Sequence, residues 1–321
     1  MTRVAVLDDW QAVAERSADW TKLRERAEIV FFRDAFASED DAAVRLRDFD
    51  VLMAMRERTA FPASLVQRLP RLRLFNLTGA RTASVDMAAL RAQGVTITHT
   101  GGGGTGSATA ELALGLMLAA ARNIAQADAS MRRGHFQTDV APGDELAGKV
   151  LGLLGLGRLG QHMARYGAAL GMTVLAWSQN LTAEAAQAGG ATWVTKDALL
   201  AESDVISLHL VLSERTRGII GAAELARMRP GALLINTSRG PLIDEPALVT
   251  ALQGGRIHAA LDVYDREPLP ADHPFRSLPN TVLTPHLGYG TAATFRDFYR
   301  QSIENVLAFL DGAPIRTLLP S

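Results

Sequence analysis

The sequence predicts an α/β protein with two mostly parallel sheets, each covered by helices on both faces. Short apolar runs alternate with helical patterns over the first hundred residues, and a second alternating series begins at Val150. Alternation of strands and helices is typical of parallel sheets. A glycine tract and a long helical pattern separate the two series, which indicates two domains in a chain of 321 residues.

The first series contains short apolar runs that read as strands, with helical patterns between them. Strands are expected at Val4–Leu7, Val30–Phe32, Val51–Met55, Leu72–Leu77 and Val95–Thr98, and helices at Ala42–Asp48, Ala63–Leu69 and Val85–Gln93.

Glycines at Gly101–Gly104 and Gly106 precede a long helix predicted at Ser107–Arg133, an arrangement that suits a hinge between domains. A last helix, Thr291–Leu310, has no place in the second sheet, so the chain is expected to return to the first domain. The strands of the second series are expected at Val150–Leu154, Thr173–Trp177, Val205–Leu208, Leu233–Asn236, His258–Leu261 and Val282–Leu283.

The most informative stretch is KVLGLLGLGRLG, Lys149–Gly160, in which an apolar strand runs into a glycine turn and an amphipathic helix. In a dinucleotide fold the first glycine allows the tight turn, and the second lets the backbone approach a pyrophosphate. The third glycine lets the helix pack closely on its strand. Free N–H groups at the helix start then hold the phosphates. The predicted cofactor residues of this turn are Gly155, Gly157, Arg158, Leu159 and Gly160.

Composition argues against several classes of function. The net charge is −1 with no Lys/Arg-rich run, so no nucleic-acid partner is expected. No run of eighteen apolar residues occurs, and Asp8 ends the first apolar run, so neither a membrane span nor a signal peptide is expected. The absence of cysteine excludes disulfides, thiolate zinc sites and cysteine nucleophiles, and no metal site is predicted. A cytoplasmic location is expected.

Four polar clusters follow predicted strands of the second series. Open α/β sheets bind their ligands at the carboxyl ends of strands, so these clusters are expected to converge beside a bound nicotinamide. The clusters are His209–Val211, Asn236–Gly240, Asp262–Pro268 and Thr284–His286.

Three of these residues suit hydride transfer to a 2-keto acid. The guanidinium fork of Arg239 matches the substrate carboxylate and can polarise the neighbouring carbonyl. His286 suits the acid that protonates the nascent alkoxide. Glu267 suits the carboxylate that orients this imidazole and favours its protonated form.

Six motifs together resemble one known family. They are GLGRLG at Gly155–Gly160, NTSRGPLIDEPAL at Asn236–Leu248, LDVYDREPLP at Leu261–Pro270, TPHLG at Thr284–Gly288, MRERT at Met55–Thr59 and TAELALGLML at Thr109–Leu118. Over nearly its whole length the chain resembles the D-isomer-specific 2-hydroxyacid dehydrogenases, including glyoxylate/hydroxypyruvate reductases.

The resemblance implies two doubly wound domains, with a Rossmann cofactor domain (99–288) inserted in a flavodoxin-like substrate domain (1–98 and 289–321). It also implies a homodimer whose interface is carried largely by the helix at Ser107–Arg133. It assigns catalysis to Arg239, Glu267 and His286, and a bond to the nicotinamide carboxamide to Asp262. Further predicted cofactor residues are Thr109, Ser178, Gln179, Asn180, His209, Val211, Thr216 and Thr237.

The resemblance also implies that the substrate carboxylate faces Arg56 and the loop Thr78–Arg81, which includes Gly79, Ala80 and Arg81. Arg58 is an alternative to Arg56. Arg81 adds a cation that suits a polar or anionic substrate tail, unless it points to solvent. Tyr289 either closes over the substrate or packs in the seam between the domains.

The second strand of the cofactor domain departs from the family pattern. Ser178, followed by Gln179 and Asn180, stands where an acidic residue usually binds the adenosine ribose. Without that carboxylate a 2′-phosphate is not repelled, although no arginine nearby clamps it. The sequence therefore favours NADP slightly over NAD and allows use of both.

The leading functional hypothesis is reversible reduction of a small 2-keto acid, such as glyoxylate or hydroxypyruvate, to the D-2-hydroxy acid. D-3-phosphoglycerate dehydrogenase is the alternative within the same class. A dinucleotide-sensing scaffold without turnover is the alternative of another class, and the complete set of Arg239, Glu267 and His286 argues against it.

Overall fold

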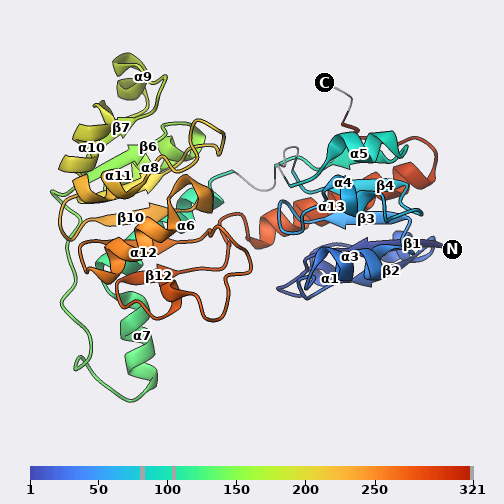
Figure 1. The fold of residues 1–321 in the computed structure, drawn as a ribbon, viewed down its shortest axis with the longest axis horizontal. Helices are drawn as coiled ribbons and strands as arrows, with labels where there is room; N and C mark the ends of the chain where they lie inside the picture. The colour runs from blue at the N-terminus through green and yellow to red at the C-terminus, as the bar shows by residue number, and fades with distance from the viewer. Residues whose placement is uncertain (80–83, 103–105, 319–321) are drawn as a thin grey trace. The chain divides into compact units, whose positions relative to one another are not determined.

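The computed structural model describes residues 1–79, 84–102 and 106–318. The chain divides into two compact units, one formed by Met1–Gly106 with Gly290–Ser321 and the other by Ser107–Tyr289. Each unit has its own parallel sheet (Figure 1). The predicted fold class, two doubly wound parallel-sheet domains with one inserted in the other, is confirmed.

The first unit contains a five-stranded sheet in the order β2-β1-β3-β4-β5, paired in parallel throughout. This is the strand order of flavodoxin-like folds. Ala5, Leu52 and Phe75 from three of its strands join one buried apolar cluster. The strands are β1 (Thr2–Val6), β2 (Ala27–Phe31), β3 (Val51–Ala54), β4 (Leu74–Leu77) and β5 (Thr96–His99), and the helices are α1 (Ala14–Ser17), α2 (Thr21–Arg24), α3 (Glu39–Leu46), α4 (Ala63–Val66), α5 (Met87–Ala92) and α13 (Ala292–Leu310).

The returning helix α13 packs against β4 and α1, as expected from the sequence (Figure 1, red). A buried polar network fixes it there. Nδ2 of Asn76 donates to Ser302 Oγ at 2.8 Å, and Nδ2 of Asn305 donates to Asn76 Oδ1 at 2.7 Å. The amide N–H of His99 bonds to the Arg316 carbonyl, and that of Gly101 to Gln301 Oε1, so the segment after β5 also falls in this unit.

The second unit contains a seven-stranded parallel sheet in the order β12-β11-β10-β9-β6-β7-β8. The chain starts in the middle at β6, proceeds to one edge, and returns to place β9 beside β6. This reversal is the switch point at which such sheets bind ligands. The strands are β6 (Val150–Leu154), β7 (Thr173–Trp177), β8 (Thr192–Trp193), β9 (Val205–Leu208), β10 (Leu233–Asn236), β11 (His258–Leu261) and β12 (Thr281–Leu283).

Helices cover both faces of the second sheet. Leu233 and Ile235 of β10 enter one apolar cluster, and Leu234 between them enters another. The helices are α6 (Ala108–Ala121), α7 (Ile124–Arg132), α8 (Arg158–Ala169), α9 (Ala183–Ala188), α10 (Lys196–Glu202), α11 (Ala222–Arg227) and α12 (Glu245–Gln253), with 3-10 turns η1 (Gly240–Leu242) and η2 (Pro274–Arg276).

The prediction of one long helix at Ser107–Arg133 is wrong. Helices α6 and α7 are bent by 65° at a break around Asn123, whose φ of 53° lies in the left-handed region. Asparagine tolerates this conformation better than most residues, and its Nδ2 donates to the Ala141 carbonyl. Within the described ranges, no single helix is long and apolar enough to cross a membrane, and only the bent pair α6–α7 passes that test by length and composition.

Element limits in the first unit differ from the prediction by up to three residues, as for β2. In the second unit the five strands from Val150–Leu154 to His258–Leu261 that the sequence predicts have the predicted limits, and β12 begins one residue earlier than expected. The exposed two-residue strand β8 was not predicted.

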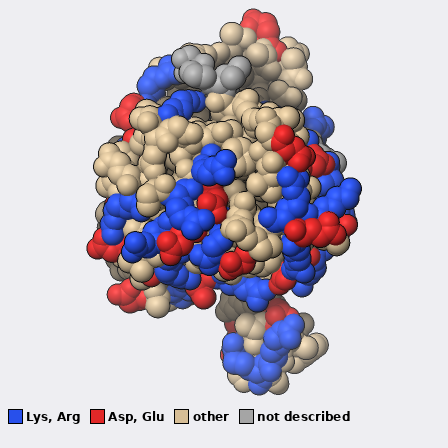
Figure 2. Space-filling model, turned by 90° about the vertical axis from the view of Figure 1, so that its right-hand side faces the viewer, with Lys and Arg blue, Asp and Glu red and all other residues tan. Residues whose placement is uncertain are grey.

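Basic and acidic side chains are interspersed on the face shown in Figure 2. In the first unit, for example, Glu15 pairs with both Arg24 and Arg33, at 2.9 and 2.7 Å. Such exposed pairs contribute little to stability. They balance the charge locally.

Candidate active site

Strand β6 runs directly into the glycine turn and α8. Gly155 has a φ of +99°, and a Cβ there would lie 2.6 Å from the His209 carbonyl oxygen. A Cβ at Gly160 would lie 2.1 Å from the Gly155 carbonyl oxygen, so this close approach of helix and strand requires glycine. Gly157 is the N-cap of α8 without a side-chain cap, and no atom of the described residues lies within 4 Å of where its Cβ would be. Open backbone at a helix start accepts a pyrophosphate, so the turn fits a dinucleotide.

Buried polar atoms without partners lie at the same edge of the sheet. Nδ1 of His209 and Oγ1 of Thr237 have no hydrogen-bond partner among the described residues. Burial lowers the pKa of His209 to about 4, so its ring is neutral at neutral pH. Its Nε2 contacts Ser207 Oγ at 2.9 Å. Buried polar groups are normally hydrogen-bonded, so these two atoms are suited to meet polar groups of a ligand.

The remaining predicted cofactor residues are dispersed around this edge. Arg158 and Leu159 open α8, and Oγ1 of Thr216 donates to the Val211 carbonyl at 2.7 Å in the loop after β9. Thr109 in α6 lies against Gly288, because its Oγ1 is 3.3 Å from where a glycine Cβ would be. Their contacts with a cofactor stay predictions.

The residues predicted to choose between NAD and NADP follow β7, the strand next to β6. Ser178 is half-buried, and Gln179 and Asn180 are exposed. No carboxylate occurs between this strand end and Glu184 in α9. The end of β7 therefore lacks the acidic group that would repel a 2′-phosphate.

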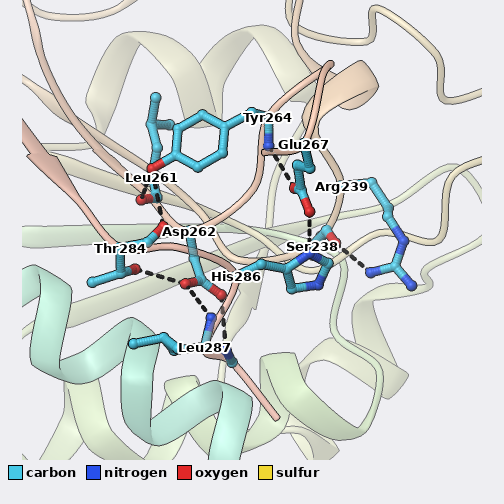
Figure 3. Close-up of polar contacts among 10 residues, drawn as sticks. Ser238, Arg239, Leu261, Asp262, Tyr264, Glu267, Thr284, His286 and Leu287 are labelled. Carbon is cyan, nitrogen blue, oxygen red and sulfur yellow. Dashed lines mark hydrogen bonds and ion pairs between the residues drawn. The ribbon is translucent and has the colours of Figure 1, made fainter. Parts of the chain in front are cut away.

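Arg239 follows β10 in a turn that Asn236 organises. Asn236 is 1% exposed; its Nδ2 donates to the Arg239 carbonyl at 2.8 Å, and its Oδ1 accepts the Ser238 N–H at 3.0 Å. Nη1 of Arg239 donates to the Ser238 carbonyl at 2.6 Å (Figure 3). The turn fixes the backbone that carries the guanidinium, whose donors form a fork that matches a carboxylate.

Glu267 and His286 form a hydrogen-bonded pair. Nδ1 of His286 lies 2.5 Å from Glu267 Oε2, and the two side chains are 17% and 20% exposed. The other carboxylate oxygen, Oε1, accepts the Tyr264 N–H at 3.0 Å (Figure 3). A carboxylate beside Nδ1 requires the proton on that nitrogen. Nε2, which has no partner among the described residues, is therefore the atom that can exchange a proton.

Asp262 holds the backbone around His286. Its Oδ1 accepts from Thr284 Oγ1 and from the Leu287 N–H, both at 2.7 Å, and its Oδ2 accepts the Gly288 N–H at 2.8 Å. The His286 N–H bonds to the Asp262 carbonyl at 2.8 Å, and His286 has a φ of 54°. Burial raises the pKa of Asp262, and these donors oppose that rise. The carboxylate is fully buried, and its predicted bond to the nicotinamide stays a prediction.

The segments that carry Arg239 and Glu267 touch each other. A Cβ at Gly240 would lie 2.1 Å from the Tyr264 carbonyl carbon and 2.5 Å from the Asp265 nitrogen. The structure thus brings together the segments of all three predicted catalytic residues, which Figure 3 shows in one close-up. The ring of Tyr289 meets that of His286 edge to face, with centroids 5.8 Å apart.

Two predicted substrate residues meet in the first unit. Arg56, at a φ of 53°, follows β3, and its N–H donates to Thr78 Oγ1 at 2.8 Å. Its Nη1 lies 2.6 Å from where a Cβ of Gly79 would be, so the guanidinium rests on the glycine. The alternative, Arg58, donates to the Asp8 carbonyl at 2.7 Å and stacks on Trp10. Ala80 and Arg81 lie outside the described residues.

Sequence reasoning missed residues that act through the backbone. Tyr264 supplies an N–H to Glu267, and its single hydroxyl hydrogen is shared between the carbonyls of Leu261 and Thr284, at 3.2 and 3.0 Å. Its position three residues before Glu267 was the available signal. The carboxylate–imidazole pair of Glu245 and His273 was also missed. No group of three or more side chains suited to a metal ion occurs in the described part of the chain.

Comparisons with known proteins agree with this geometry. The model for the family described as D-isomer specific 2-hydroxyacid dehydrogenase, NAD binding domain, matches residues 114–288. A glyoxylate reductase of Aeropyrum pernix is 39% identical over 77% of this chain and 76% of that protein. A D-3-phosphoglycerate dehydrogenase of Archaeoglobus fulgidus is 37% identical over 84% of this chain and 51% of that protein, so this chain spans about half the length of that relative. The solved phosphoglycerate oxidoreductase of Vibrio cholerae O395 is 34% identical with a TM-score of 0.92, covering 98% of this chain and 100% of that one.

Proposed function

Because this chain belongs to the D-isomer-specific 2-hydroxyacid dehydrogenase family, we propose that it interconverts a small 2-keto acid and the D-2-hydroxy acid. We expect a substrate of the glyoxylate or hydroxypyruvate type. The observation that carries the proposal is the hydrogen-bonded pair of His286 and Glu267, whose Nδ1 and Oε2 atoms are 2.5 Å apart. These two residues follow β12 and β11, at the carboxyl ends of the same parallel sheet in which the glycine turn follows β6. A dinucleotide-sensing scaffold, which converts no substrate, has no need for such a pair.

Arg239 binds the substrate carboxylate through its guanidinium fork and polarises the adjacent carbonyl. Glu267 holds the Nδ1 proton of His286, so the ring presents Nε2 to the substrate oxygen. A nicotinamide dinucleotide, when bound, would supply the hydride that the carbonyl carbon receives in reduction. His286 gives its Nε2 proton to the carbonyl oxygen in reduction and takes it back in oxidation, so each turnover balances one hydride and one proton.

The glycine turn and the buried atoms of His209 and Thr237 would hold the dinucleotide. We propose that the enzyme uses NADP or NAD, with a slight preference for NADP. The support is Ser178, which stands at the end of β7 where an acidic residue would disfavour the 2′-phosphate.

Phosphoglycerate dehydrogenase is the second candidate. The relatives named for that activity are as similar to this chain as the glyoxylate reductase, at 37% against 39% identity. The smaller acids remain our first choice, and the panel assay described below decides between the two candidates.

We further propose a homodimer and a cytoplasmic location. Ile124 and Met131 in α7 and Phe136 after it are 52%, 56% and 72% exposed. Apolar side chains exposed together on one segment suit an interface with a second copy. Size-exclusion chromatography with light scattering tests the dimer, and a monomer at micromolar concentration would contradict it.

The test of the proposed function is a panel assay with the purified protein. NADH and NADPH oxidation is followed by absorbance with glyoxylate, hydroxypyruvate and 3-phosphohydroxypyruvate, and the His286→Ala variant supplies the background rate. We expect the highest kcat/KM with one of the two smaller acids. A clear preference for the phosphorylated acid would select the second candidate. Dinucleotide binding without turnover of any keto acid would favour the sensing scaffold.

A further inference from the structure

A second histidine–glutamate pair lies in the second unit, outside the residues assigned to the reaction. Nε2 of His273 lies 3.1 Å from Glu245 Oε1, and the two side chains are 15% and 20% exposed. Glu245 opens α12 six residues after Arg239, and His273 follows Glu267 by the same number of residues. The pair therefore joins the segment after one predicted catalytic residue to the segment after another.

Glu245 holds both ends of the segment that contains Glu267. Its Oε2 accepts the Asp265 N–H at 3.3 Å, while its Oε1 meets His273. Asp265 begins the segment and His273 ends it. One carboxylate thus closes a loop around Glu267, and loss of either contact frees one end of that loop.

His273 is fixed in one orientation. Its Nδ1 accepts the Phe275 N–H at 3.3 Å, so the proton belongs on Nε2, which then donates to Glu245. The ring also packs on Phe275, which is 1% exposed, with centroids 4.6 Å apart. Both ring nitrogens are engaged by the protein. His273 therefore suits a positional role and not proton transfer to a ligand.

The pair acts where the two catalytic segments are already in backbone contact. Gly240, next to Arg239, touches Tyr264 and Asp265, and the Tyr264 N–H donates to Glu267 Oε1. Tyr264 precedes Asp265 in the chain and bonds to Glu267, so a shift of Asp265 would move the Glu267 carboxylate through Tyr264. Because Gly240 contacts Asp265 and is the chain neighbour of Arg239, the same shift would also change the distance between Glu267 and Arg239.

We propose that Glu245 and His273 are a positioning pair that sets the geometry of Glu267 relative to Arg239 without touching the substrate. This inference rests on the proposed function. A displacement of about 1 Å in such a site can cost about 100-fold in rate. We therefore expect Glu245→Ala to lower kcat by about tenfold or more, with an unchanged Kd for the dinucleotide.

Glu224 supplies a matched control in the same unit. It is 19% exposed, accepts from Lys196 at 2.8 Å and from the Gly221 N–H at 3.0 Å, and has no assigned part in the reaction. Glu224→Ala and Glu245→Ala remove comparable contacts, so both should lower Tm. Only Glu245→Ala should lower kcat. Equal kcat in the two variants would overturn the inference.

A pair of variants at His273 separates positioning from folding if Glu245→Ala is unstable. His273→Gln keeps a donor that reaches Glu245, and His273→Phe keeps the ring contact with Phe275 but removes the donor. We expect kcat close to the wild-type value for His273→Gln and about tenfold lower for His273→Phe. The same kcat in both would show that the bond to Glu245 does not matter.

A double-mutant cycle with Glu267→Gln gives the last readout. If the pair acts through Glu267, the kcat effect of Glu245→Ala should fall below about twofold in the Glu267→Gln background. An undiminished effect there would overturn the inference while the proposed function stands. Absence of keto-acid turnover in the wild-type protein would overturn both.

Discussion

Two histidine–glutamate pairs of the second unit have nearly the same burial but different surroundings. The side chains of His286 and Glu267 are 17% and 20% exposed, and those of His273 and Glu245 are 15% and 20% exposed. Both ring nitrogens of His273 are bound by the protein, whereas Nε2 of His286 has no partner in the described part of the chain. A carboxylate partner alone therefore does not make a histidine an acid catalyst. A ring nitrogen left for the substrate is needed as well.

The largest expected effect separates the two histidines directly. His286→Ala removes the proton donor and should lower kcat by at least about 100-fold, because general acid catalysis contributes 10²–10⁴-fold. His273→Ala should cost only about tenfold, since it disturbs position and leaves the donor in place. Steady-state kinetics at saturating dinucleotide measures both. Equal losses of kcat in the two variants would contradict the proposal that His286 donates a proton and His273 only positions the site.

The second prediction tests the anchoring by Asp262, which His286 has and His273 lacks among the described residues. The carboxylate of Asp262 accepts three donors, and Asp262→Asn would turn an amide N–H toward one of them. We expect kcat to fall by about 30-fold and the free energy of unfolding to fall by about 1–3 kcal/mol. Thr284→Val removes a single donor and should have a smaller effect on both. The kcat and the Tm of Asp262→Asn are measured together. An unchanged kcat would contradict the proposal that Asp262 anchors His286 for the reaction.

The sequence predicted the second sheet better than the helices that follow the glycine tract. Strand β6 is an apolar run bounded by a glycine, so its limits could be read directly. The break at Asn123 could not, because Ala, Leu and Met on both sides favour helix and the left-handed asparagine is set by its bond to Ala141. Strand β8 has two exposed residues and exists only through its pairing with β7.

In the candidate site, too, some residues could be predicted from the sequence and others could not. Arg239, Glu267 and His286 were found because each follows a predicted strand and carries a side chain with recognisable chemistry. The contributions of Tyr264 and Asn236 depend on a backbone N–H and on a buried amide, whose partners are fixed only by the folded turn. Sequence patterns reveal chemical groups, whereas contacts made through the backbone require the structure.

The third prediction concerns the cofactor end of the site and should leave both pairs unaffected. Ser178→Asp places a carboxylate at the end of β7, where it would repel a 2′-phosphate and bind the ribose of NAD. We expect the ratio of kcat/KM for NADPH over NADH to fall by about tenfold, or about 1.4 kcal/mol. Thr182→Asp is the control, because it adds the same charge at the N-cap of α9. An unchanged ratio in Ser178→Asp would place coenzyme selection elsewhere.

The smallest effect comes from His209, which has no carboxylate partner in the part of the chain that the structure describes. Burial lowers its pKa in the folded protein to about 4 from its ordinary value of 6.5, so the unfolded chain binds more protons between these values. His209 therefore favours the folded state above pH 6.5 and loses that contribution as the pH falls toward 4. We expect its share of the loss between pH 7 and about pH 5.7 to be about 1 kcal/mol, measured by urea unfolding. The loss should be smaller in His209→Asn, whose side chain does not titrate, and equal slopes in the two proteins would mean that the ring is not buried as a neutral group.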